Sequence, residues 1–163
     1  MEERDRVGVA AVYDRAFWRD DGLTGQAVSL TGPMNFCVDD SPPSGRPGIL
    51  FGFVGGDEGR KFLAKSAADR QAAVLDQFAI FFGSKAKSPL QYFETNWGAK
   101  AWTRGSPVGI APPGVLVATR EAIREPVGRI HWAGTETSDY WVGYMDGAVR
   151  SGERAAKEVL AEL

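Results

Sequence analysis

The sequence predicts an α+β protein, with an antiparallel or mixed β-sheet that carries helices on one face. Two observations support this fold class. Short apolar runs separated by turn residues fill the first half, and connections this short favour antiparallel pairing because a parallel crossover needs a dozen or more residues. Apolar residues then recur at helical spacing in the middle of the chain and again at its end.

The expected strands are short segments rich in β-branched and aromatic residues. They lie at residues 7–13, 34–38, 49–54 and 90–97, and a weakly alternating segment lies at residues 26–31. The connector at residues 41–48 contains three prolines, which cannot donate to a strand ladder, so it separates two of these strands.

Two helices are expected in the middle of the chain and a third after it. The first covers residues 57–65. The next begins at Ser66, which forms a capping-box pattern with Asp69, and ends at Gly83. Residues 98–114 are rich in glycine and proline and predict a shaped loop, and residues 115–124 predict a helix.

The most regular pattern is at the end of the chain. We expect a buried strand at residues 129–134, a turn, and a helix at residues 144–163. Gly152 and Ala156 lie one turn apart on its apolar face, and small residues there allow the close helix-to-sheet packing of a nucleotide-binding βα unit. The sequence therefore predicts two regions, residues 1–128 and 129–163.

Composition excludes several classes of protein. The chain has 163 residues, 44% of them hydrophobic, and a formal net charge of -2, which is typical of one globular domain. Its basic residues are scattered, so nucleic acid is not an expected partner. No apolar run reaches the length of a membrane span, and the first residues lack a signal-peptide pattern, so we expect a cytoplasmic protein. The single cysteine, Cys37, has no Cys or His at ligand spacing, and no metal site is expected.

Three linked motifs point to a family. They are Ala-Gly-Thr-Glu-Thr at residues 133–137, Gly-Tyr-Met-Asp-Gly-Ala-Val at residues 143–149, and Gly-Glu-Arg-Ala-Ala at residues 152–156. Together they resemble the C-terminal signature of flavin-containing monoamine oxidases. Further pieces in the same order resemble that family: Tyr13 to Trp18 (Y-x-x-x-F-W), Asn96-Trp97, and Ala111 to Gly114 (A-P-P-G). The resemblance covers nearly the whole chain.

The resemblance implies a non-covalent FAD site and an amine substrate. In the family the start of the last helix faces the pyrimidine edge of the flavin, a place that Tyr144 and Met145 take here, and Glu136 would meet ribityl or ribose hydroxyls. Tyr144 would also form one ring of a two-ring cage around the amine, as the catalytic candidate. The implied cofactor-binding residues are Gly134, Thr135, Glu136, Trp141, Gly143, Tyr144 and Met145. Without the resemblance, the residues by themselves favour a purely structural interpretation, in which Glu136 only caps the turn and Tyr144 is only a packing residue.

Several family positions differ in this chain. The second cage ring corresponds to Pro107, the flavin-linking cysteine of animal enzymes to Ser106, and a lysine near the flavin to Gly8. The G-x-G-x-x-G motif of dinucleotide sites is absent, because the glycine cluster at residues 55–59 has the wrong spacing. His131, the only histidine, is interpreted as structural.

These observations leave three functions open. The first is the C-terminal part of an amine oxidase, which would deaminate amines by hydride transfer to FAD, followed by reoxidation by oxygen, once another chain supplies the FAD-binding half. The second is a non-catalytic binding module without flavin, and the third is a truncated gene product. Because an unpaired strand edge promotes association, a homodimer or a complex with the missing half is expected.

Overall fold

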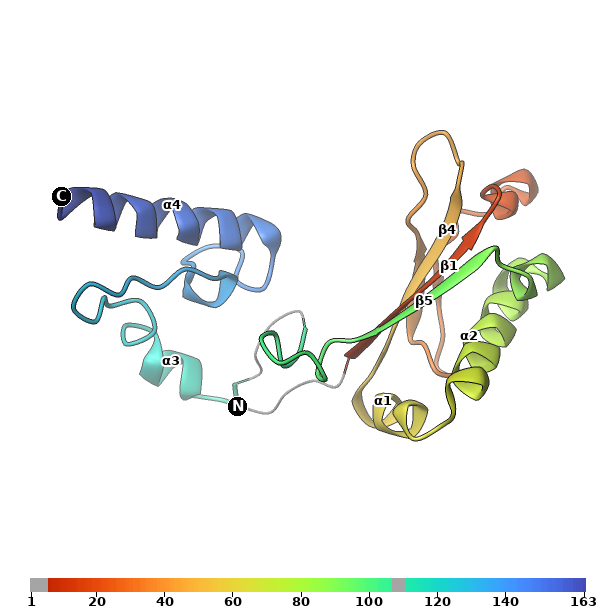
Figure 1. Ribbon diagram of the computed structural model, residues 1–163, viewed down its shortest axis with the longest axis horizontal. Coiled ribbons are helices and arrows are strands. Elements are labelled where there is room, and N and C mark those ends of the chain that lie inside the picture. The colour runs from red at the N-terminus through yellow and green to blue at the C-terminus, as the bar shows by residue number, and fades with distance from the viewer. Residues whose placement is uncertain (1–5, 107–110) are drawn as a thin grey trace. The chain divides into compact units, whose positions relative to one another are not determined.

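The computed structural model describes residues 6–106 and 111–163 and separates into two compact units. One unit extends to Gly105, and the other comprises the chain from Ser106 onward. Each unit has its own elements, which are coloured along the chain in Figure 1. The two units are described separately below.

The first unit is built on one antiparallel sheet, as predicted. Its strands are β1 (Arg6–Tyr13), β2 (Ala27–Val28), β3 (Phe36–Asp39), β4 (Gly48–Gly55) and β5 (Gln91–Asn96). Their order in the sheet is β2-β3-β4-β1-β5, and every pair is antiparallel (Figure 1). The weakly alternating segment at residues 26–31 yields only the two-residue β2.

Two helices follow β4 in this unit, α1 (Gly56–Leu63) and α2 (Ala67–Phe82). The predicted cap of α2 is confirmed, because the Ser66 hydroxyl accepts a hydrogen bond from the Asp69 N–H at 3.2 Å. Gly83 ends the helix with φ +87°, a conformation that glycine adopts without strain.

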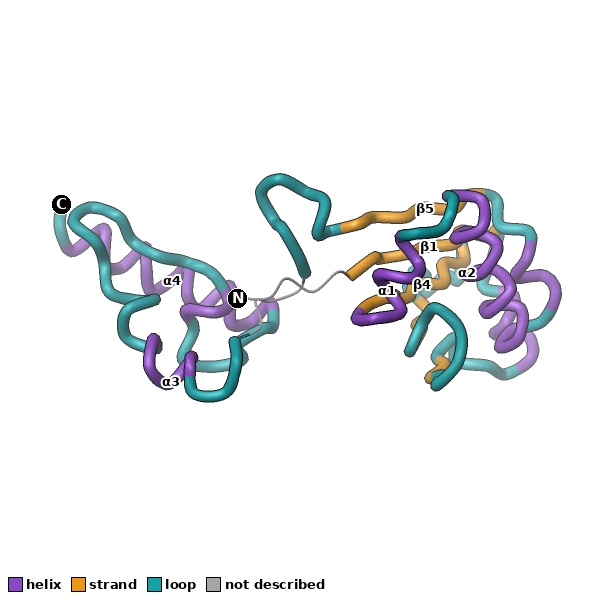
Figure 2. Tube along the Cα trace, turned by 90° about the horizontal axis from the view of Figure 1, so that it is seen from below, coloured by secondary structure: helices purple, strands orange, loops and turns teal. Residues whose placement is uncertain are grey.

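The helices and one face of the sheet enclose the core. Alternate residues of β1 point to this face, so Val7, Val9 and Ala11 are fully buried. The core continues with Leu50 and Val54 of β4, Phe62 of α1, and Val74 and Phe78 of α2. In the tube view α1 and α2 lie together on the same side of the strands (Figure 2). The helices therefore lie on one face of the sheet, as predicted.

The opposite face of the sheet is apolar and partly exposed. Phe36 on β3 and Phe93 on β5 are 37% and 54% exposed. Phe51 and Phe53 are carried by β4, which lies between β3 and β5 in the sheet. Their rings meet edge to face, with centroids 4.8 Å apart. The first unit thus presents one uncovered aromatic surface.

The second unit contains α3 (Val115–Thr119), one 3-10 turn at Thr135–Thr137, and α4 (Met145–Ala161). The long final helix is confirmed within a few residues at each end. The helix predicted at residues 115–124 is shorter than expected and continues as turns after Thr119.

The strand predicted at residues 129–134 is wrong. This segment forms only a single bridge, between Val127 and Ile130, and is otherwise irregular. A strand requires a neighbour for its backbone groups, and none forms in the described part of this unit. Side chains form hydrogen bonds with these backbone groups instead. The Ser151 hydroxyl accepts a hydrogen bond from the Gly134 N–H, and Arg154 donates one to the Trp132 carbonyl.

The predicted boundary between residues 128 and 129 lies inside the second compact unit. Arg124 donates to the carbonyls of Thr137 and Ser138 at 2.8 and 2.6 Å, and Trp132 donates to the carbonyl of Glu125 at 3.1 Å. These bonds join the two sides of the predicted boundary. The division of the chain into residues 1–128 and 129–163 stays a prediction.

Candidate functional site

Thr135 organises the turn that precedes α4. Its hydroxyl accepts a hydrogen bond from the Gly143 N–H at 2.7 Å and donates to the Tyr144 carbonyl at 2.8 Å. Gly143, with φ +87°, supplies the left-handed residue that this close approach requires. The Thr135 hydroxyl is therefore used within the turn, which it holds against the start of the helix.

Gly147 permits the tight contact between α4 and the loop before it. A Cβ atom at this position would lie 2.3 Å from the Trp141 carbonyl oxygen, which is closer than real Cβ contacts come. Trp141 itself has φ +52°, an uncommon conformation for a residue with a bulky side chain. Such strain persists only where the surroundings impose it, and it is concentrated at functional sites.

Exposed aromatic rings gather beside the start of α4. The rings of Trp141 and Tyr144 meet edge to face with centroids 5.4 Å apart, and Tyr140 adds a third ring 6.1 Å from Trp141. These three side chains are 55–63% exposed, and Met145 is 87% exposed. An apolar group of this kind on a surface indicates a contact site for a ligand or partner.

The start of α4 has no side-chain cap. Tyr144 occupies the N-cap position, and its side chain makes no capping hydrogen bond. The first N–H groups of a helix are unpaired within the helix and form the positive end of its dipole. This end of α4 therefore favours negative charge.

Glu136 lies beside Gly134, because a Cβ atom on that glycine would lie 3.4 Å from the Glu136 Oε2 atom. It lines a cavity of about 390 Å³ with Val117, Arg120, Arg124 and Asp139 among its neighbours. Both arginines pair with Asp139, so their charges are partly neutralised. The structure brings together all the predicted site residues, which are Gly134, Thr135, Glu136, Trp141, Gly143, Tyr144 and Met145, and Glu136 also lines this cavity.

Ser151 and Arg154 are site-supporting residues that sequence reasoning missed. The buried Ser151 hydroxyl accepts from the Gly134 N–H at 3.0 Å and donates to the Ala148 carbonyl at 2.8 Å. Arg154 reaches the Trp132 carbonyl at 2.7 Å and the Thr137 hydroxyl at 3.2 Å. Polar residues on the small, buried face of an amphipathic helix were the available signal, since burial there requires hydrogen-bond partners.

Of two positions that differ from the family, Gly8 and Pro107, the structure describes only the first. Gly8 lies on the uncovered face of the sheet, where a Cβ atom would meet the Trp97 indole nitrogen at 3.4 Å and the Phe51 ring at 3.6 Å. A side chain at this position would therefore project among aromatic groups. Pro107, the counterpart of the second cage ring, is outside the described residues.

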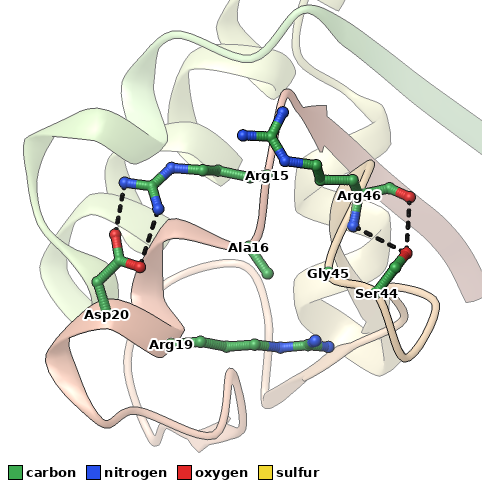
Figure 3. Close-up of a pocket in the computed structure, with 7 residues that line it drawn as sticks. All are labelled: Arg15, Ala16, Arg19, Asp20, Ser44, Gly45 and Arg46. Carbon is green, nitrogen blue, oxygen red and sulfur yellow. Dashed lines mark hydrogen bonds and ion pairs between the residues drawn. The ribbon is translucent and has the colours of Figure 1, made fainter.

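Another cavity, of about 220 Å³, is lined by three arginines of the first unit (Figure 3). Each guanidinium already has a carboxylate partner. Arg15 pairs with Asp20 at 2.6 Å, Arg19 with Asp39 at 2.8 Å, and Arg46 with Asp14 at 3.1 Å. Of these three carboxylates, only Asp20 lines the cavity.

In residues 6–106 and 111–163, no three His, Cys, Asp or Glu side chains are grouped so as to hold a metal ion. Over the same residues, no helix combines the length and the apolar composition that crossing a membrane requires.

Comparison with known proteins identifies the family of this chain. Residues 7–160 match the model of the family described as flavin containing amine oxidoreductase. The chain belongs to this family, whose cofactor is a flavin.

Three relatives illustrate the match. An L-amino acid dehydrogenase of Synechocystis is 42% identical over 93% of this chain and 32% of its own length. A probable flavin-containing monoamine oxidase A of Dictyostelium discoideum is 41% identical over 96% and 34%. A putative flavin-containing monoamine oxidase of Mycobacterium tuberculosis is 46% identical over 94% and 33%. The chain thus spans about a third of the length of the relatives it matches.

Solved structures agree with this assignment. Cyclohexylamine oxidase from Brevibacterium oxydans superposes with a TM-score of 0.89 and 36% identity, over 98% of this chain and 35% of that one. Putrescine oxidase bound to putrescine superposes with a TM-score of 0.88 and 31% identity, over 98% and 36%. The fold is that of the corresponding third of these enzymes.

Proposed function

We propose that this chain forms the C-terminal, flavin-contacting part of an FAD-dependent amine oxidase. The observation that carries the proposal is the uncapped start of α4, surrounded by the exposed Trp141, Tyr144 and Met145. The remaining two thirds of the enzyme, on the same polypeptide or on another, would supply the dinucleotide site, because the chain has no G-x-G-x-x-G motif.

The residues at this surface fit the ring system of a flavin. The open end of α4 offers N–H groups and a positive dipole end to the pyrimidine edge of the isoalloxazine. Gly134 and Gly143 leave the backbone approachable, and Ser106 in place of a cysteine makes the attachment non-covalent. Bound FAD would accept a hydride from the carbon next to the amine nitrogen and pass its electrons to oxygen.

The aromatic side chains have a separate role in this proposal. Tyr144 and Trp141 would form one wall beside the amine, where apolar rings exclude water and orient an uncharged amine. Tyr144 is therefore the residue of this chain closest to a catalytic role. A cytoplasmic location and assembly with the FAD-binding half belong to the same proposal.

Complementation tests this function directly. The first two thirds of the Mycobacterium tuberculosis relative would be co-expressed with the 163-residue chain and copurified. We expect a complex with flavin absorbance that an amine substrate bleaches under anaerobic conditions. Substituting Tyr144→Ala should reduce the bleaching rate per bound flavin by about tenfold. A complex that forms and holds no flavin contradicts the proposal.

A second candidate is a binding module that has lost catalysis. Gly8 and Pro107, which replace the lysine and the second cage ring, favour it. The same complex separates the two functions: a complex that forms without flavin indicates the binding module, and a bound flavin that amines reduce indicates the oxidase.

A further inference from the structure

Three arginine side chains line the cavity of about 220 Å³ in the first unit. Arg15 and Arg19 follow β1, and Arg46 belongs to the connector that precedes β4. The Ala16 N–H donates to the Gly45 carbonyl at 2.8 Å, which holds these two segments together. In Figure 3 the side chains of Arg15 and Arg46 lie on one side of Ala16, and that of Arg19 lies on the other. Cationic side chains therefore border the cavity on two sides.

Arg19 is the fixed member of the three. Its Nε and Nη2 atoms each lie 2.8 Å from Asp39 Oδ2, and the Asp39 side chain is only 9% exposed. The remaining nitrogen, Nη1, reaches the Pro43 carbonyl only at 3.5 Å, and it lies 3.1 Å from the place that a Cβ atom on Gly45 would take. The pair with Asp39 therefore fixes the guanidinium plane and leaves Nη1 beside a residue that lines the cavity.

The ion pairs of Arg15 and Arg46 are exposed and can exchange partners. Arg15 and Asp20 are 47% and 46% exposed, and Arg46 and Asp14 are 62% and 71% exposed. Arg46 binds Asp14 through Nη1 alone, so its Nε and Nη2 atoms have no partner among the described residues. Because exposed ion pairs contribute little to stability, an anion can replace either carboxylate at small cost.

Charge and hydrogen-bonding geometry favour a tetrahedral oxoanion. The residues that line the cavity include three arginines and one aspartate, an excess of two positive charges. Asp39 offsets one of these charges from behind Arg19, whereas Asp14 is exposed to solvent, which screens its field. Guanidinium groups bind phosphate oxygens in pairs, and a phosphate group has enough oxygens to meet them from several directions. A carboxylate has two oxygens in one plane, which match a single guanidinium.

We propose that this cavity is a binding site for a phosphate group, carried either by the free ion or by a phosphorylated small molecule. Arg19 Nη1 and the N–H groups of Arg46 donate to its oxygens, and Arg15 joins them when it leaves Asp20. The site is independent of the proposed flavin surface, because all of its residues belong to the first unit.

Titration of inorganic phosphate with the full chain, followed by phosphorus NMR at about pH 8, where phosphate is a dianion, tests the site. Sodium chloride keeps the ionic strength constant, so that non-specific attraction does not change. We expect a dissociation constant of about 1 mM, because the site is open to solvent and its arginines are partly paired. Glycerol phosphate is titrated in parallel. A monoester that binds at least as tightly as phosphate assigns the site to a phosphorylated molecule, and one that binds more weakly assigns it to the free ion.

Four variants locate the site. Arg15→Gln combined with Arg46→Gln should weaken phosphate binding by about tenfold or more. Arg46→Lys, which keeps the charge and loses the planar pair of donors, should weaken it by about threefold. Asp20→Asn frees Arg15 from its partner and should tighten binding by about threefold. Arg60→Gln is the control, because Arg60 lies on α1 in an exposed pair with Asp57, and it should bind phosphate as the wild type does.

Phosphate that binds the double arginine variant as tightly as the wild type would overturn the proposal. A wild-type chain without saturable binding up to about 10 mM phosphate would do so as well. Asp20→Asn keeps the test decisive if the double variant fails to fold, because unfolding cannot tighten binding. A lower affinity in Asp20→Asn would count against the site.

Discussion

At the scale of single residues, Asp39 is the most heavily bonded carboxylate in the first unit. It accepts hydrogen bonds from Trp18 Nε1 at 2.9 Å, Arg19 Nε at 2.8 Å and the Ser41 N–H at 2.8 Å. These bonds join β3 to the 3-10 turn at Phe17–Asp21 and to the connector that follows. Asp39 thus ties β3 and the adjoining connector to a turn that lies 20 residues earlier in the sequence.

Asp39 should make stability depend on pH in the acid range. Burial by itself raises the pKa of its carboxyl, but the hydrogen bonds from Arg19, Ser41 and Trp18 outweigh burial and lower the pKa to about 2. Because the folded-state pKa is below the unfolded value of about 3.9, the stabilisation is present above pH 4 and is lost as pH falls toward 2.

Urea unfolding of Asp39→Asn measures this contribution. We expect the free energy of unfolding to fall by about 2 kcal/mol at pH 7 and by clearly less at pH 3. Asp14→Asn, whose carboxylate is exposed in its pair with Arg46, serves as control and should change stability by less than about 0.5 kcal/mol. An equal loss for Asp39→Asn at both pH values would contradict the assignment.

At the scale of elements, α4 contains two glycines with opposite surroundings. Gly147 faces the Trp141 carbonyl at a distance that no Cβ atom tolerates, whereas a Cβ atom at Gly152 would meet nothing within 4 Å. Both positions lie within the same helix, where alanine is favoured over glycine by about 1 kcal/mol. The helix alone would therefore gain from either substitution.

Alanine at these positions should have effects of opposite sign. Gly152→Ala should raise the free energy of unfolding by about 0.5–1 kcal/mol. Gly147→Ala should lower it by about 1–3 kcal/mol, because the loop that carries Trp141 must move away. Thermal unfolding followed by circular dichroism gives both values. A stabilised Gly147→Ala variant would show that the loop does not pack as described.

Elements whose signals are local were predicted well from the sequence. The cap at Ser66 and the stop at Gly83 depend on neighbouring residues only, and so does the apolar period of α4. The segment at residues 129–134 was predicted as a strand from its apolar composition, but a strand exists only where another strand pairs with it. The contacts of Ser151, Arg154 and His131 join residues far apart in sequence, and spacing alone does not reveal them.

At the scale of the whole molecule, the chain carries about a third of the length of its relatives, and its sheet has one covered and one uncovered face. Gly8 lies on the uncovered face, and Gly52 lies on the covered face, where a Cβ atom would come within 2.6 Å of the Met34 sulfur. Substitution of each glycine therefore tests how closely its face of the sheet is packed.

The chain should tolerate an added methyl group on the uncovered face of the sheet and be destabilised by one on the covered face. Gly8→Ala should change the free energy of unfolding by less than about 0.5 kcal/mol, since its contacts are ordinary van der Waals contacts. Gly52→Ala should cost about 1–3 kcal/mol through overpacking. Chemical denaturation of both variants is the measurement, and equal effects would indicate that the uncovered face is occupied in solution.

The local character of the contacts around α4 has a consequence for the time course of folding. The bond from Gly134 to Ser151 spans 17 residues, and the bond from Arg154 to Trp132 spans 22. Closing the first unit requires contacts such as that from Tyr13 to Ala86, which spans 73 residues. Shorter loops close faster, so the turn that is proposed to meet the flavin should be in place before the sheet of the first unit is complete.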